Sequence, residues 1–167
     1  CCAAAPGVHP PTVPAFLPQT QLLAYSMMGG FWAPELKHAG YDQVIIRGKS
    51  SDLVYLWIHN DKVEIRDASH LRGKGAIETA ECIRQELKEP NAQVAAIGLA
   101  GENRVFYAST EQGRSSASRG GIGAVMRHKR LKAVVVRGAK DVTVPRPAEL
   151  RVPSAARPQH LPPPAHP

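Results

Sequence analysis

The residues best suited to chemistry lie in one short stretch, GRSSASRGG, at positions 113–121. Its hydrogen-bond donors are charged guanidinium groups and neutral hydroxyls, from Arg114, Arg119, Ser115, Ser116 and Ser118. The glycines after Arg119 would let an anion approach the backbone at the start of a helix, where N–H groups are unpaired. The stretch therefore suits a phosphate or another anion, and a flexible glycine-rich turn with solvated arginines is the alternative.

The same local design occurs twice in the chain. Residues 29–49 and residues 119–138 both run from a Gly-Gly pair through a helix-compatible segment to three aliphatic residues and Arg-Gly. Neither copy is a P-loop or a GxGxxG dinucleotide motif. Two copies of one design indicate two copies of one task, such as holding a ligand with two similar anionic halves.

Groups that could perform catalysis are scattered. The histidines of the central sequence stand apart, without the HExxH spacing of a metal site: His38, His59, His70 and His128. The cysteines, Cys1, Cys2 and Cys82, form no CxxC pair. Glu102 and Asn103 follow a predicted strand, where a turn role is expected. This part of the chain is therefore predicted to hold a ligand rather than to transform one.

Composition excludes several classes of protein. The net charge of +7 is spread along the chain and aromatic residues make up 5%, whereas a nucleic-acid groove needs clustered charge and stacking side chains. Prolines interrupt the apolar N-terminal part, so we expect neither a membrane span nor a secretory signal. Cysteines without a disulfide framework favour a reducing, cytoplasmic setting.

Hydrophobic periodicity predicts interleaved strands and helices. Strands are expected at 22–26, 43–48, 93–101, 104–109, 131–138 and 142–144, with a hairpin over 52–67 that turns at Asn60-Asp61. Helices are expected between Gly30 and Gly40, over 76–88 and over 121–130. The hairpin excludes a purely parallel sheet. The predicted class is α+β, with mixed β-sheets, short helices and two related halves.

Four segments together carry a family resemblance: MMGGFWAPELKHAGYDQVIIRGKS, VYLWIHNDKVEIRDASHLRGKGAIETAE, VAAIGLAGENRVFYAS and SASRGGIGAVMRHKRLKAVVVRG. Over about 17–149 the sequence resembles the N-terminal domain of the tungsten-containing aldehyde ferredoxin oxidoreductase family. SMMGGFWAPELK and ENRVFYASTEQGRSSASRGGIGAVM resemble in particular the active-site subunit of the ATP-independent (class II) benzoyl-CoA reductases.

The resemblance implies a base of two sheets related by a pseudo-twofold axis, which carries a tungsten or molybdenum bis-pyranopterin cofactor. One half of the cofactor would be lined by Met27, Met28, Gly29 and Gly30. The other half would be lined by Arg114, Ser115, Ser116, Arg119, Gly120 and Gly121. A magnesium ion between the pterin phosphates would take backbone carbonyls of Met27 and Ser116.

The sequence also departs from the family pattern. An arginine that contacts the pterin in relatives has no counterpart here, because His9 and Pro10 stand near its place. The later domains, with the cysteines of a 4Fe-4S cluster and the substrate-side acid and base, are not found. We expect a Pro-rich start at 1–17, a pterin-binding domain at 18–149 and a Pro-rich disordered tail at 150–167.

The implied function is that of a truncated cofactor-binding domain, inactive alone, from an oxidoreductase. The parent enzyme would move electrons between an acyl-CoA or aldehyde and an iron–sulphur cluster. Its partners would be the missing domains, an iron–sulphur or ferredoxin-type protein and further copies of itself, with no nucleic acid and no membrane. The alternative is a non-catalytic anion-binding or interaction module that keeps the fold without cofactor.

Overall fold

The run of β-branched residues near the end of the sequence forms the centre of the main sheet. In this computed structural model, which describes residues 12–17 and 22–142, β8 (Leu131–Arg137) lies between β3 (Val54–His59) and β5 (Gln93–Ala96). Val134 faces one apolar core and Val135 faces the other. A strand covered on both faces is apolar at successive positions, which explains the AVVV sequence.

The main sheet has six strands in the order β4-β3-β8-β5-β6-β7. Its other members are β4 (Lys62–Asp67), β6 (Thr110–Gln112) and β7 (Ser115–Ala117). The β3–β8 pair is parallel and the other pairs are antiparallel. A separate antiparallel pair joins β1 (Thr12–Leu17) to β2 (Leu22–Met27). The predicted α+β class with mixed sheets is confirmed.

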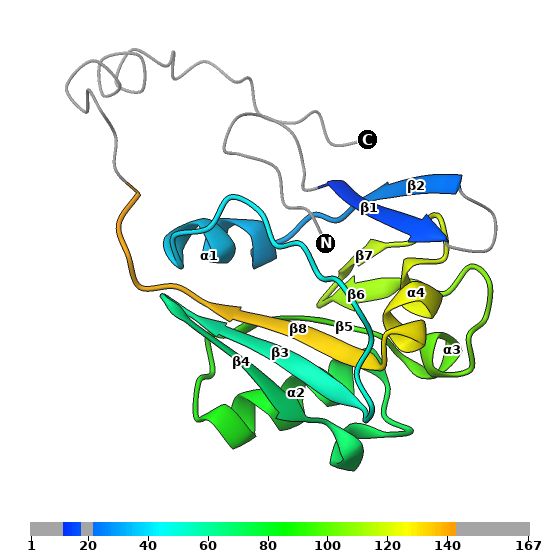
Figure 1. Cartoon of the computed structure of the whole chain (residues 1–167). Helices are drawn as coiled ribbons and strands as arrows, with labels where there is room; N and C mark the ends of the chain where they lie inside the picture. Colours follow the sequence, from blue (N-terminus) through cyan, green and yellow to red (C-terminus); the bar gives the residue numbers. More distant parts are fainter. Residues whose placement is uncertain (1–11, 18–21, 143–167) are drawn as a thin grey trace, which may run out of the picture.

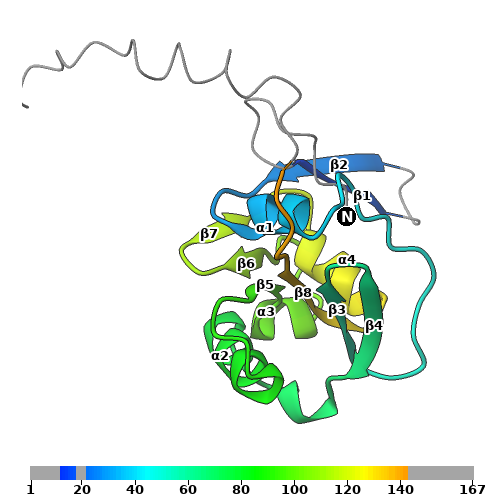
Figure 2. The same cartoon turned by 90° about the vertical axis from the view of Figure 1, so that its left-hand side faces the viewer.

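Helices cover both faces of the sheet (Figures 1 and 2). On one side η1 (Ser69–Leu71) leads to α2 (Ala76–Leu87), whose Ala76, Ala80 and Ile83 are buried as its periodicity predicts. On the other side lie two helices of seven residues, α1 (Trp32–His38) and α4 (Ile122–His128), each preceded by a Gly-Gly pair. The short α3 (Leu99–Glu102) packs beside α4.

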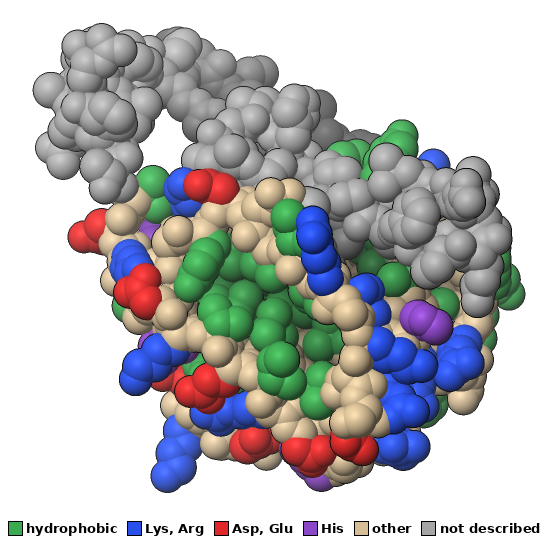
Figure 3. Space-filling view, viewed as in Figure 1, with side chains coloured by type: hydrophobic (Ala, Val, Ile, Leu, Met, Phe, Trp, Pro, Cys, Tyr) green, Lys and Arg blue, Asp and Glu red, His purple; other side chains and the backbone are tan. Residues whose placement is uncertain are grey.

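Each side of the sheet has its own apolar core. The core on the α2 side includes Tyr55, Trp57 and Ile83. The core on the α1 and α4 side includes Trp32, Leu36, Ile58, Ile122 and Met126. This second core is partly open, because apolar side chains gather in a hollow in the middle of the face seen in Figure 3.

The hairpin predicted over 52–67 is confirmed, with Asn60 at a φ of 51° in its turn. Gly40, at a φ of 96°, directly follows the capping residue of α1, as predicted. The helices expected over 76–88 and 121–130 also form, as α2 and α4.

Two predicted strands are wrong. Residues 43–48 form an extended segment without strand pairing, in which Val44 and Ile46 pack on the core and Ile45 is 60% exposed. Residues 104–109 form turns that leave Phe106 and Tyr107 exposed, and the strand starts at Thr110. Strand propensity measures fit to a pleated surface, so a β-branched run without a neighbouring strand does not become a strand.

Two other boundaries differ from the prediction. The strand expected over 93–101 ends at Ala96, and the residues from Leu99 turn into α3. Val142 lies outside any strand, and the other two residues of the strand expected at 142–144 lie outside the described residues.

Candidate functional site

The two predicted ligand-binding segments meet in the fold. A Cβ built on Gly29 would lie 3.3 Å from Ser115 Oγ, and one built on Gly30 would lie 2.0 Å from Gln112 Oε1. The backbone N–H of Arg119 donates a hydrogen bond of 3.2 Å to Ser26 Oγ, across 93 positions of sequence. The segment after β2 therefore lies against the β6–β7 hairpin, so that both can contact one ligand.

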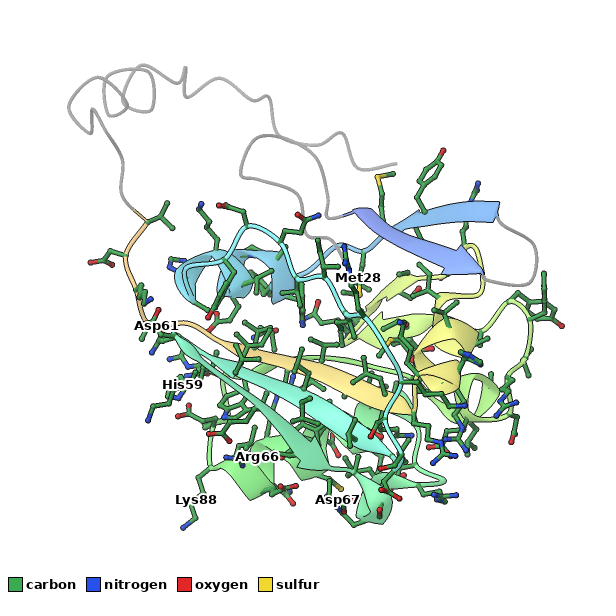
Figure 4. The ribbon with its side chains drawn as sticks, in the orientation of Figure 1. Met28, His59, Asp61, Arg66, Asp67 and Lys88 are labelled. Atoms are coloured by element: carbon green, nitrogen blue, oxygen red, sulfur yellow. The ribbon has the colours of Figure 1, made fainter. Side chains whose placement is uncertain are left out.

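The two methionines before the glycines have different environments. Met28 is 4% exposed and anchors its segment in the core on the α1 side, and Figure 4 shows it between β2 and the main sheet. The Met27 side chain is 54% exposed at the end of β2. Just beyond the glycines, Trp32 Nε1 donates to the Val134 carbonyl at 3.0 Å. Anchors on both sides therefore fix the backbone of Gly29 and Gly30.

The β6–β7 hairpin carries the polar groups of the second segment. Gly113, at a φ of 57°, makes the turn, and Arg114 beside it is exposed. Ser115 is half-buried and faces Gly29. The Ser116 and Ser118 hydroxyls share a hydrogen bond of 2.7 Å. The arginine and the three serines therefore lie close together in the sequence, just after the turn at Gly113.

Two exposed cations flank this hairpin. Arg114 and Arg119 are exposed, and the ion pairs found among the described residues involve neither of them. Their guanidinium groups are thus free to meet an anionic ligand, to which arginine donates charge-assisted hydrogen bonds.

The glycines before α4 have two distinct roles. Gly120, at a φ of 70°, is exposed. Gly121, at a φ of 63°, is buried, and a Cβ there would lie 2.2 Å from the Phe106 carbonyl oxygen. The sequence motif assigns both glycines to anion approach, whereas the structure gives Gly121 a packing reason of its own.

A buried ion pair supports the loop beneath Gly121. Lys132 is fully buried, and its Nζ donates to Glu102 Oε1 at 2.5 Å and to the Lys74 carbonyl at 2.8 Å. Glu102 Oε2 accepts from the Gly73 N–H at 2.9 Å. The Glu102 carbonyl accepts from Arg127 Nε on α4 at 3.1 Å. Glu102 therefore does more than close a turn, while Asn103 caps α3 as a turn residue would.

The two Arg-Gly ends of the repeat are not equivalent. Arg137 Nη1 pairs with Glu35 Oε1 of α1 at 2.6 Å, and this hydrogen bond raises the pKa of Arg137. A Cβ on Gly138 would lie 2.2 Å from the Ala39 backbone nitrogen. Arg47, in contrast, is exposed in the unpaired segment. Arg137 and Gly138 thus dock α1 on β8 and do not line the candidate site.

Three histidines make contacts within the protein that account for their positions without a ligand. His38 Nδ1 lies 2.8 Å from the Lys140 carbonyl, His59 stacks on Trp57, and His70 Nε2 lies 3.1 Å from Glu86. His59 is at the tip of the β3–β4 hairpin with Asp61, away from Met28 (Figure 4). Within the described ranges, no group of three His, Cys, Asp or Glu residues could hold a metal ion.

Two residues of the contact between the segments were missed by the sequence analysis, namely Ser26 and Gln112. Gln112, the last residue of β6, is 7% exposed, and Ser26, the last but one of β2, is 5% exposed. Both lie within the sequence segments that carry the family resemblance, but neither was singled out, because the burial of a polar residue is visible in the fold alone.

The sequence was compared with known families and structures. Residues 2–138 match the sequence model described as aldehyde ferredoxin oxidoreductase, N-terminal domain. Because this match spans most of the chain, the protein belongs to that family of oxidoreductase domains. The predicted family is therefore confirmed.

Particular relatives are longer than this chain. It is 48% identical over 128 residues to a tungsten-containing aldehyde ferredoxin oxidoreductase of Pyrococcus abyssi, covering 76% of this chain and 21% of the relative. It is 41% identical over 137 residues to an aliphatic sulfonate oxidoreductase, WOR-like subunit, of Pyrococcus furiosus, covering 73% of this chain and 22% of the relative. The chain spans about a fifth of the relatives' length.

A solved structure is more similar still. It is described as the active site complex BamBC of benzoyl coenzyme A reductase in complex with 1,5-dienoyl-CoA, at 74% identity and a TM-score of 0.79. The match covers 85% of this chain and 21% of that one. Across the part of the sequence that the structure describes, no helix is both long and apolar enough to cross a membrane.

Proposed function

We propose that this chain is the tungsten-bis-pterin-binding part of an oxidoreductase of the benzoyl-CoA reductase type. The observation that carries the proposal is that the first Gly-Gly pair with the end of β2 lies against the β6–β7 hairpin and the residues after it, as seen at Gly30 and Gln112 and at Ser26 and Arg119. A ligand with two similar anionic halves needs such paired segments on one surface. The 74% identity to a benzoyl-CoA reductase structure supports the same class of enzyme.

The residues present fit such a cofactor. Gly30 has no side chain because Gln112 Oε1 occupies that space, and this amide oxygen is buried without a partner among the described residues. Exposed guanidinium groups and serine hydroxyls adjoin it, which suits phosphate. The site thus combines glycine backbone that a ligand can approach closely, a buried amide oxygen without a hydrogen-bond donor among the described residues, and two positively charged arginines.

The roles of the residues follow from their positions. Backbone groups of Met27, Met28, Gly29, Gly30 and Gly120 would line the cofactor, and Arg114, Ser115 and Arg119 would bind its phosphates. Carbonyls of Met27 and Ser116 would hold magnesium. When bound, the tungsten–pterin group supplies the redox chemistry, and the protein supplies position and electrostatics.

The rest of the reaction is assigned to further polypeptide. Because the chain spans about a fifth of its relatives, the 4Fe-4S cluster and the groups that act on an acyl-CoA or aldehyde would come from other domains or subunits. Such partners would cover the site and exclude water. By itself the chain would hold cofactor without turnover.

The test is metal content. The full chain is produced in cells that synthesise the tungsten–pterin cofactor, and tungsten and molybdenum per chain are measured by mass spectrometry. We expect the natural sequence to retain metal and Gly30→Ala to lower the content about tenfold. The reason is that a methyl group at residue 30 would push the Gln112 amide, the end of a flexible side chain, out of its place beside Gly30.

Gly48→Ala is the matched control. Gly48 has a φ of 77°, close to the 87° of Gly30, but a Cβ there meets nothing within 4 Å. Backbone strain is therefore similar in the two variants and only the collision differs. Gly48→Ala should keep its metal. A natural sequence without metal would favour the non-catalytic anion-binding module instead.

A further inference from the structure

The side chain of Gln112 ends in a buried oxygen that has no hydrogen-bond partner among the described residues. Gln112 is the last residue of β6 and is 7% exposed. Its Nε2 donates to Gln93 Oε1 at 2.8 Å. A buried carbonyl without a donor is costly, and native structures keep few of them.

The orientation of the carboxamide is fixed by its neighbours. Gln93 Nε2 donates to the Asn91 backbone carbonyl at 3.0 Å, and that carbonyl can only accept. Gln93 must therefore turn its oxygen towards Gln112, and Gln112 must turn its NH₂ group towards Gln93. Rotating either amide by half a turn would break this chain of donors. The oxygen of Gln112 is thus directed away from Gln93.

This oxygen is directed at the backbone that the two segments share. A Cβ on Gly30 would lie 2.0 Å from it, so it occupies the space that any side chain at residue 30 would need. Ser115 Oγ lies equally close to the neighbouring glycine, at 3.3 Å from a Cβ on Gly29. Two polar groups of one hairpin therefore reach the same Gly-Gly pair, whose outer side is exposed.

We infer that Gln112 is a ligand-contacting residue that accepts a hydrogen bond from an N–H group of the bound heterocycle through Oε1. This inference rests on the proposed function, because a pterin ring offers such N–H donors. Binding converts an unpaired buried oxygen into a paired one. Selectivity follows, since a ligand that presents an acceptor at this position leaves the oxygen unpaired.

The experiment compares Gln112→Met with Gln93→Met in the full chain. Methionine matches the length of glutamine but has no amide. Gln112→Met removes the acceptor, whereas Gln93→Met keeps Oε1 and removes the side chain that orients the Gln112 amide. Both variants are produced with the cofactor present, and tungsten and molybdenum per chain are measured after extensive dialysis.

We expect cofactor affinity to fall about tenfold in Gln112→Met, which corresponds to about 1.4 kcal/mol, and to fall clearly less, by about threefold, in Gln93→Met, where the acceptor remains but is no longer oriented. The second measurement is urea unfolding of the cofactor-free chains. Because Gln112→Met eliminates an unpaired buried oxygen, its midpoint should be no lower than that of Gln93→Met. A merely structural glutamine would lose stability and cofactor together.

Each other outcome overturns the inference. Metal retention by Gln112→Met equal to that of the natural sequence shows that the oxygen does not contact the ligand, and leaves the proposed function standing. Equal losses of metal and of stability in both variants assign Gln112 a structural role alone. A natural sequence that retains no metal overturns the proposed function, and this inference with it.

Discussion

Glycine at two positions of this protein is required for two different reasons. At Gly30 the missing side chain makes room for the amide of Gln112, and at Gly121 it makes room for the Phe106 carbonyl. Both residues have a positive φ, at 87° and 63°, which strains other residue types. At both positions glycine is needed for its backbone conformation, and the neighbouring group shows which contact the missing side chain makes possible.

Tyr55 gives a pH-dependent prediction. It is fully buried on β3, and burial together with the hydrogen bond to Glu86 at 2.8 Å raises its pKa to about 12. Its pKa in the unfolded chain is about 10. The stabilisation is thus complete below pH 10 and is lost as the pH rises through 12, because the unfolded state releases the proton first.

We expect this group to remove up to about 2–3 kcal/mol of unfolding free energy between pH 10 and pH 12. The measurement is urea unfolding across that range. Tyr55→Phe has no phenol to ionise and should show a flatter profile, so the difference between the two profiles belongs to Tyr55 alone. Parallel profiles for the two proteins would contradict the assignment.

At the level of the elements, a bulge in β8 stabilises the loop from α3 to β6. The pairing of β3 with β8 skips Lys132, so that β8 carries an extra residue at that point. Such a bulge redirects a side chain. Here Lys132 reaches Lys74 and Glu102, and Glu102 in turn fixes the loop that contacts Gly121.

Breaking the pair should therefore be costly. Glu102→Gln leaves the buried ammonium of Lys132 without its counter-charge, for which we expect a loss of about 3 kcal/mol of unfolding free energy. Replacing both partners, with Glu102→Gln and Lys132→Met, should recover most of that loss. The measurement is chemical denaturation followed by circular dichroism.

The exposed pair of Lys74 and Glu78, at 2.6 Å, is the control for this element. Glu78→Gln removes the same kind of charge from a site where water screens it, and should cost below about 0.5 kcal/mol. If Glu102→Gln lowered the free energy of unfolding as little as Glu78→Gln, the pair of Lys132 and Glu102 would not stabilise the fold.

In the whole molecule, one sheet separates two cores that share its central strand. Val134 of β8 belongs to the core on the α1 side and Val135 to the core on the α2 side. Neither core can loosen without exposing β8. The chain should therefore unfold in a single transition.

The two tryptophans make this prediction measurable. Trp32 lies in one core and Trp57 in the other, each 5% exposed. In Trp32→Phe the fluorescence reports on the core around Trp57, and in Trp57→Phe it reports on the core around Trp32. Within each variant, the fluorescence and circular dichroism midpoints in urea should coincide. Separate midpoints would mean that the cores unfold independently.

Several parts of the structure could be read from the sequence. The alternation of residues 54–59, the turn at Asn60 and the amphipathic period of residues 76–87 gave the β3–β4 hairpin and α2, because local pattern decides these elements. The motifs around Gly29 and Arg119 also indicated the family that the comparisons confirm.

Tertiary contacts decided the rest. Val44, Ile45 and Ile46 resemble the valines of β8 in type, yet only the latter have strands on both sides and form a strand themselves. Ser26 and Gln112 gained their significance from segments that lie far away in the sequence. Local sequence sets the conformations that a segment prefers. The choice of neighbours, which determines buried polar contacts and strand pairing, depends on packing that the chain defines only as a whole.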